Sequence, residues 1–273
     1  MSENIQDYNE PIRRLSRDLK EATKLMSKDQ VRYLVDLYYQ IQDFRIQTSG
    51  QMRSMNEQAE NPEPVNVIEW VFDNQRRIEN GIKSALDYYT DNESSGMGKW
   101  AKSIVGIGPV ISSGLLAHID IEKAPTVGHI WRFAGLDPTS KWEKKTKRPW
   151  NAKLKVLCWK AGESFIKFQN HKNDVYGKFY VQRKAQEQAE NESGKYAAQA
   201  EEILKSKKIG KETEAYKSYS QGKLPPAHIH ARARRWAVKI FLYHWFAEAY
   251  RRKWDREPPK PYVIEHLGHV HLI

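Results

Sequence analysis

The stretch Gly106-Ile-Gly-Pro-Val-Ile-Ser-Ser-Gly-Leu-Leu-Ala-His-Ile-Asp120 decides the fold class of this chain. Gly106 and Gly108 form a tight turn, and Pro109 fits the first turn of a following helix because its missing amide needs no partner there. The residues after it form an apolar helix, and no convincing run of alternating strand residues occurs elsewhere. The sequence therefore predicts a mostly α protein, with an all-α helix-hairpin-helix domain around this turn.

Two long helical patterns precede the turn. Ser27 and Gln30 have the spacing of a capping box at the start of the first pattern. Asn61-Pro-Glu-Pro64 then breaks the periodicity before the second pattern begins. Long helices joined by a proline-containing turn predict an antiparallel hairpin. We expect a coiled-coil arm at 27–95 after a polar lead at 1–26, either as a dimer surface or packed on its own domain.

Three further regions follow the arm. The helix-hairpin-helix core is expected at 96–170, with Asn151 as a candidate cap for its last helix. Residues 171–223 are charged and poor in large apolar side chains, which predicts a mobile insertion or linker. A basic helix and a tail, 224–273, complete the core.

The composition of the 273 residues narrows the class of protein and of partner. Lys and Arg number 45 against 34 Asp and Glu, a net charge of +11, which favours a polyanionic partner such as nucleic acid. The 31 Trp, Tyr and Phe side chains (9, 14 and 8) are too many for a disordered chain. The single cysteine, Cys158, excludes an internal disulfide and a multi-cysteine zinc site. With no signal peptide and no membrane span in the sequence, a cytoplasmic protein is expected.

Three features carry the expected contacts. The turn at Gly106 and Gly108, with Lys102 before it and Ser112 after it, offers amides at a helix N-terminus to a phosphate, or is only a tight helix-helix turn. The loop 141–148 interleaves cations with Trp142, which suits backbone neutralisation and base stacking. The alternative is a solvated loop with its tryptophans folded inward.

The third feature lies in the C-terminal helix. His228, Arg232, Arg235 and Lys239 recur at i, i+4, i+7 and i+11, which places them on one stripe of a helix opposite an apolar face. Such a stripe suits a helix lying along phosphates, unless several of its members pair with Asp or Glu instead.

Together these features predict nucleic-acid contacts along the chain. The candidate residues are Lys102, Gly106, Gly108, Ser112, Arg132, Lys141, Lys144, Lys145, Lys147, Arg148, Lys153, Lys155, His228, Arg232, Arg235 and Lys239.

The sequence contains few signs of metal binding or catalysis. His266, His269 and His271 lie close in sequence, but only Glu265 stands near them to complete a metal site. The sequence contains no zinc-protease motif, phosphate-binding Walker loop or dinucleotide fingerprint. We therefore expect no catalytic residue, no metal and no cofactor.

Several of these segments resemble known proteins. The stretch 106–120, Trp131-Arg-Phe-Ala-Gly-Leu-Asp-Pro138 and Asn151-Ala-Lys-Leu-Lys155 resemble the C-terminal domain of bridge-RNA-guided, DEDD-type transposases. With the hairpin and Arg232-Ala-Arg-Arg-Trp-Ala-Val-Lys239, the chain also resembles the Nop domain of box C/D ribonucleoproteins and of the guide-RNA-binding Tas proteins of tandem interspaced guide RNA arrays. The resemblance implies a Nop-like fold, a small structured guide RNA, target DNA paired with that RNA, and a homodimer formed through the arm.

The departures from the transposases bear on activity. Those enzymes have a RuvC-like domain with four acidic residues, and a nucleophilic serine in a Ser-Gly step after a Gly-Leu-x-Pro motif. Here Pro138 is followed by Thr-Ser-Lys-Trp, and Ser140 stands at a different offset. We expect no nuclease within this sequence, so that any cleavage needs a separate nuclease.

Two other functions remain open at this point. One is a transposase- or recombinase-derived protein that acts on DNA with a separate RuvC-like subunit and depends on Ser140 or a divalent metal. The other is a helix-hairpin-helix protein that binds any DNA duplex without RNA.

Overall fold

The computed structural model describes residues 17–58 and 66–259, and every regular element within these ranges is a helix. This confirms the mostly α fold class. The chain divides into two compact units. The N-terminal unit contains the residues up to Lys102 and residues 108–120, and the C-terminal unit contains residues 103–107 and those from Ile121 onward. The chain therefore passes between the units three times.

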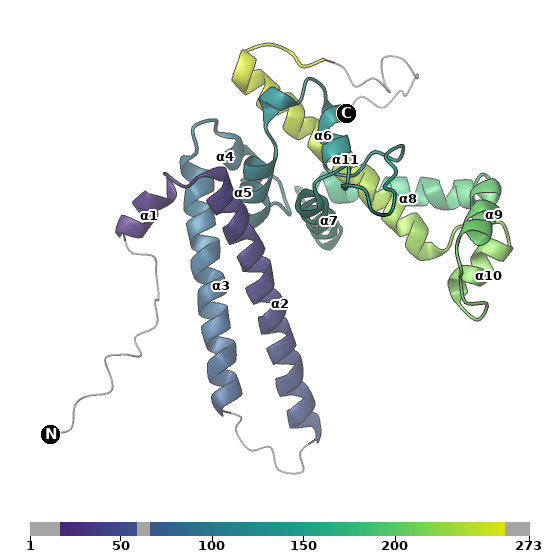
Figure 1. The fold of residues 1–273 in the computed structure, drawn as a ribbon, viewed down its shortest axis with the longest axis horizontal. Helices are drawn as coiled ribbons and strands as arrows, with labels where there is room; N and C mark the ends of the chain where they lie inside the picture. The colour runs from purple at the N-terminus through teal and green to yellow at the C-terminus, as the bar shows by residue number, and fades with distance from the viewer. Residues whose placement is uncertain (1–16, 59–65, 260–273) are drawn as a thin grey trace. The chain divides into compact units, whose positions relative to one another are not determined.

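The N-terminal unit is built on two long helices that lie side by side (Figure 1). The predicted capping box is confirmed, because the Gln30 amide donates to Ser27 Oγ (3.2 Å) and the Ser27 amide donates to Gln30 Oε1 (2.8 Å). The helices of this unit are α1 (Arg17–Thr23), α2 (Lys28–Gln58), α3 (Asn66–Asn92), α4 (Met97–Lys102) and α5 (Pro109–His118).

The core of this unit lies where α5 packs against the start of α2 and the end of α3, so these two helices run antiparallel. Val31, Leu86 and Leu115 are fully buried there. Arg32 of α2 donates from Nε and Nη2 to the carbonyl of Ala117 at 2.9 and 2.6 Å. These bonds satisfy a carbonyl near the end of α5 that has no partner within the helix.

The C-terminal unit is organised around the long helix α11. Helices α6, α7 and α8 pack against α11, and α9 packs against α10. The predicted apolar face of this helix is confirmed, because Ala233, Ala237, Phe241 and Trp245 are buried. The elements are a 3-10 turn (Ile121–Lys123), α6 (Val127–Phe133), α7 (Ala152–Lys167), α8 (Tyr176–Glu192), α9 (Ala197–Ser206), α10 (Glu214–Ser220) and α11 (Pro226–Trp254).

Residues 171–223, expected as a mobile insertion or linker, instead contain α8, α9 and α10. The prediction was wrong because it relied on the scarcity of large aliphatic residues in this segment. The segment is packed instead through buried tyrosines and buried polar groups. Tyr176 and Tyr180 are buried against α11. Glu187 and Asn191 are buried as well, with their polar atoms hydrogen-bonded. Charged composition alone therefore did not reveal the packing.

The expected core at 96–170 is also divided differently. Helices α4 and α5 belong to the N-terminal unit, whereas α6 and α7 belong to the C-terminal unit. Among the described helices, none combines the length and apolar character needed to cross a membrane.

Candidate nucleic-acid interface

The loop between α6 and α7 has a closed, well-packed base. Gly135 takes a left-handed conformation (φ +66°) directly after α6, and a side chain there would meet the Trp150 ring at 2.8 Å. The amide of Asn151 donates to the Phe133 carbonyl at 2.9 Å, which ties the two ends of the loop together. The predicted cap is confirmed, because Asn151 Oδ1 accepts from the Leu154 amide at 2.9 Å.

The tip of this loop is built around Trp142. Its Nε1–H donates to the Thr146 carbonyl at 2.9 Å, and Thr146 Oγ1 donates to the Glu143 carbonyl at 2.8 Å. Lys145 takes a left-handed conformation (φ +68°) within this turn. The guanidinium of Arg148 lies 4.8 Å from the centre of the Trp142 ring, which remains 48% exposed. The ring is therefore held in place and open to solvent.

The surface around the tip is strongly positive. Glu143 is the only acidic residue among residues 141–155. Within the described part of the chain, the loop cations and Lys155 are exposed and have no ion pair. These six residues, hereafter the loop cluster, are Lys141, Lys144, Lys145, Lys147, Arg148 and Lys155.

Electrostatic effects connect the loop cluster to α11. Lys155 Nζ lies 4.3 Å from the centre of the Trp150 ring. Although the residue as a whole is exposed, its amine is partly shielded from water against Trp150, and this desolvation, followed by the positive charges of Arg235 and Arg148, lowers the pKa of Lys155. Arg235 of α11 is exposed and has no ion pair among the described residues. Because its charge acts on Lys155, it adds a cation of α11 to the positive surface of the loop cluster. Lys153 is also exposed on α7.

Arg132 and Lys239 act electrostatically on Asp137, which follows α6. Burial of Asp137 opposes its ionisation, but hydrogen bonds from Thr139 and the charges of Lys239 and Arg132 outweigh it and lower the pKa of Asp137. Arg132 is exposed, whereas the amine of Lys239 lies over the Trp131 ring at 4.2 Å. Lys239 is thus occupied in packing α6 against α11.

The expected basic stripe on α11 is largely used inside the protein. Arg232 donates from Nε to Glu187 Oε2 at 2.6 Å and lies over the Tyr196 ring at 4.6 Å. His228 Nδ1 lies 3.2 Å from the Tyr219 hydroxyl. With Lys239 on Trp131, Arg235 is the exposed member of the stripe. The expectation failed here because the partners that α6, α8 and α10 supply to this face of α11 cannot be read from the spacing of one helix.

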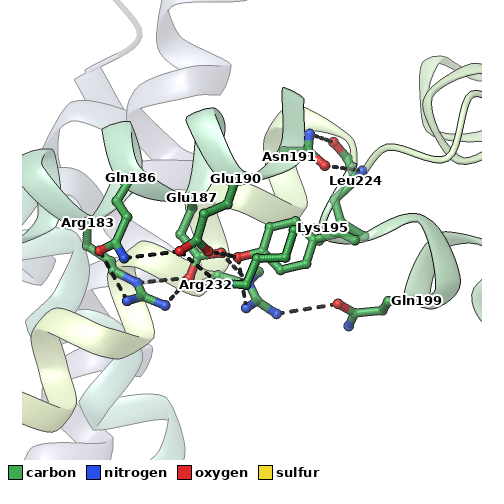
Figure 2. Close-up of polar contacts among 10 residues, drawn as sticks. Arg183, Gln186, Glu187, Glu190, Asn191, Lys195, Gln199, Leu224 and Arg232 are labelled. Atoms are coloured by element: carbon green, nitrogen blue, oxygen red, sulfur yellow. Dashed lines mark hydrogen bonds and ion pairs between the residues drawn. The ribbon is translucent and has the colours of Figure 1, made fainter. Parts of the chain in front are cut away.

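Glu187 is the centre of this internal network, as Figure 2 shows. Its side chain is 2% exposed, and Arg183 donates to Oε1 from Nε (2.9 Å) and Nη2 (2.5 Å). Tyr196 donates to Oε2 at 2.6 Å. Burial raises the cost of the Glu187 charge, but the bonds from Arg232, Tyr196 and Arg183 outweigh it and lower the pKa. Sequence reasoning missed this carboxylate, although Arg183 and Glu187 have the i, i+4 spacing of a helical ion pair.

The Gly106–Gly108 turn does not present the expected phosphate site. Lys102 forms ion pairs with Asp87 (2.5 Å) and Asp91 (2.8 Å). Ser112 is fully buried and donates to the Gly98 carbonyl at 3.3 Å. Gly106, at φ +92°, accepts from Ser164 Oγ at 2.6 Å. Gly108 precedes α5 and is exposed, but Pro109 removes the first amide of that helix.

The remaining candidate residues are those considered for metal binding and catalysis. The three tail histidines lie outside the described residues. Within residues 17–58 and 66–259, no group of three His, Cys, Asp or Glu could hold a metal ion. Cys158 is buried, and burial raises the pKa of its thiol to about 12, so it is not a reactive thiolate near neutral pH. Ser140 Oγ lies 3.5 Å from Asp137 Oδ2, at the limit of a hydrogen bond.

Comparisons with protein-family models, with curated proteins and with solved structures find no match for this chain.

Proposed function

We propose that this protein binds a small structured RNA and presents it to target DNA. The observation that carries the proposal is the loop cluster, a set of exposed cations without acidic partners around a fixed, half-exposed Trp142. Cations on a tethered loop neutralise phosphates at little conformational cost, and an open indole face stacks on an unpaired base. Arg235 and Arg132 extend this surface beyond the loop.

The resemblance to Nop-type and Tas proteins supports RNA as the bound nucleic acid. In this proposal the RNA pairs with DNA to select the target, and the protein contacts backbone and shape. The chain supplies no nuclease of its own, and any cleavage belongs to a separate protein. The alternatives, a DNA transposase-derived protein and a general duplex-binding protein, are outcomes of the tests below.

The first experiment is to purify the protein with its bound nucleic acid and to sequence that material. A discrete population of short RNAs with a common fold is expected. Random RNA, or DNA alone, would exclude the guide-RNA function. In parallel, the affinity for a transcribed RNA hairpin is measured across a range of salt concentrations. A slope of log K against log salt close to zero would show that phosphate contacts do not drive binding.

Trp142 is expected to contribute base stacking in addition to the charges. Replacing Trp142 by Ala should weaken binding of an RNA hairpin with an unpaired loop by about 10- to 100-fold, because one stacked base is worth about 1–3 kcal/mol. Trp142→Phe should retain much of the affinity. Fluorescence anisotropy with a labelled hairpin measures both.

The matched control for this prediction is Trp159→Ala. Trp159 is 46% exposed, lies under Arg234 (5.3 Å) and sits outside the loop on α7. Equal losses for the two alanine variants would remove Trp142 from the proposed site.

We further propose that the arm joins two copies of the protein. Phe44, Trp70 and Ile78 are 54, 62 and 51% exposed on α2 and α3, although apolar side chains of this size stabilise helices by burial. Residues 40–58 carry two acidic and two basic side chains, so this part of the arm is neutral in a chain of net charge +11. A neutral, apolar surface does not repel a second copy.

The dimer has a direct test. Replacing Trp70 and Ile78 together by Glu should convert the protein to a monomer in light scattering, with its helical content unchanged by circular dichroism. Gln47→Glu with Asn80→Glu changes the charge equally at exposed polar positions of the same helices. A wild-type protein that is monomeric at micromolar concentration would contradict the proposal.

A further inference from the structure

The turn after α9 carries a second group of cations outside the expected site. Lys207, Lys208 and Lys211 are exposed and have no ion pair among the described residues. The other lysines of this region differ, because Lys205, Lys217 and Lys223 pair with Glu201, Glu214 and Glu192. Lys207, Lys208 and Lys211, hereafter the turn lysines, therefore place three positive charges without an ion-pair partner on one short segment.

The segment that contains the turn lysines and the flanking helices α9 and α10 is attached to α8 and α11 by polar contacts, several of which are drawn in Figure 2. Asn191 of α8 accepts from the Leu224 amide at 2.8 Å and donates to the Leu224 carbonyl at 2.9 Å. Tyr196, before α9, donates to the buried Glu187 at 2.6 Å. Tyr219 of α10 contacts His228 of α11. These bonds hold the segment beside the start of α11.

The same end of α11 connects the turn lysines to the loop cluster. Tyr219 of α10 contacts His228 at this end of α11. Burial lowers the pKa of His228, and the positive charges of Arg235, Arg232 and Lys207 lower it further. Towards the other end of the stripe, Lys239 contacts Trp131 of α6. His228 and Lys239 are eleven positions apart, which corresponds to roughly 16 Å of helix.

A span of roughly 16 Å corresponds to about five base pairs along a duplex. The turn lysines lie between α9 and α10, and Tyr219 of α10 contacts His228 of α11, whereas the loop cluster adjoins α7, which packs against α11. The two groups of cations are thus attached to the same helix. The turn lysines have no aromatic side chain between them, since residues 207–211 are Lys-Lys-Ile-Gly-Lys and Ser206 precedes them. Their chemistry suits phosphates and not unpaired bases, in contrast to the Trp142 loop.

We propose that Lys207, Lys208 and Lys211 form a second phosphate contact, which grips the double-helical stem of the same nucleic acid that the loop cluster binds. This inference rests on the proposed function. It adds a footprint: the loop holds one part of the nucleic acid, Arg235 lies between, and the turn lysines hold the stem about five base pairs further along.

The test replaces the three turn lysines by Ala and uses two labelled RNA hairpins with the same loop. One hairpin has a stem of about 20 base pairs, and the other has a stem of about four, too short to reach the turn. The triple variant should bind the long stem on the order of 100-fold more weakly, with a salt slope reduced by about 2–3, and should bind the short stem like the wild type.

The control is the triple variant Lys205→Ala, Lys217→Ala and Lys223→Ala, which removes the same charge from the same region of the chain but from paired lysines. It should bind both hairpins nearly like the wild type. Equal losses in the two triple variants, or an unchanged affinity of the first for the long stem, would overturn the second contact while leaving the proposed function intact. A wild-type protein that binds neither hairpin would overturn both.

Discussion

Replacing Lys141, Lys144, Lys147 and Arg148 together by Ala is expected to weaken RNA binding on the order of 100- to 1,000-fold at physiological salt. Each cation that contacts a phosphate releases most of one counterion, so four lost contacts reduce the slope of log K against log salt by about three. Lys145 is left in place because its left-handed backbone (φ +68°) makes a substitution there a test of turn geometry as well as charge. Filter binding or anisotropy across a salt series measures both quantities.

The quadruple variant has a matched control in the N-terminal unit. Lys28, Arg53, Lys83 and Lys99 are exposed cations on α2, α3 and α4, and replacing them by Ala removes the same four charges. If both variants lose affinity equally, the net charge of the protein drives binding and the loop has no special role. A loss confined to the loop variant, with unchanged thermal stability, supports the site.

Replacing Glu187 by Ala should have the largest effect on stability, about 3 kcal/mol. The carboxylate is buried between Arg183 and Arg232, and its removal leaves these two guanidinium groups without their carboxylate partner, whereas the Tyr196 hydroxyl keeps Glu190 as an acceptor. Glu187→Gln keeps the shape and one acceptor oxygen, so a smaller loss is expected. Urea unfolding followed by circular dichroism gives the free energies.

The control for this prediction is Glu192→Ala on the same helix. Glu192 is 69% exposed at its side chain and pairs with Lys223 at the surface, so the expected loss is below about 1 kcal/mol. A Glu187→Ala protein that unfolds like the Glu192→Ala protein would show that α8, α9 and α11 do not depend on the buried carboxylate.

The pH dependence of the unfolding free energy tests the network around Glu187 in a second way. The pKa of Glu187 is lowered, and hydrogen bonds from Lys195 and Tyr196 lower that of Glu190 to about 2. A carboxyl with a lowered pKa stabilises the fold above its unfolded-state pKa and loses that contribution as pH falls through its folded-state pKa. Wild-type stability should therefore fall from about pH 5 towards pH 2, and less steeply in Glu187→Ala.

Local signals in the sequence predicted local structure well. The capping box at Ser27, the cap at Asn151 and the apolar face of α11 follow from spacing alone, because one helix determines each of them. Contacts between helices distant in sequence were not predictable in this way. Arg232 meets Glu187 across 45 residues, and helical spacing alone cannot reveal such a partner.

The same difference between local and long-range contacts explains why the loop cluster stays available as a site and the glycine turn does not. The loop cations stay exposed because an irregular loop with one acidic residue offers them no internal partner. Lys102 and Ser112 stand near the glycine turn in sequence, but the N-terminal unit uses both in its own packing. Whether a cation is available to a ligand depends on tertiary neighbours, which composition and spacing do not specify.

The path of the chain between the two units has a consequence for how the protein is made. Helix α5 belongs to the N-terminal unit, yet residues 103–107 before it belong to the C-terminal unit. A ribosome that has released only the first 102 residues has not yet supplied the helix that completes the N-terminal core. Gene fission at residue 102 would leave the first product without Leu115 and its buried neighbours, so neither half is a ready-made module for fusion to another protein.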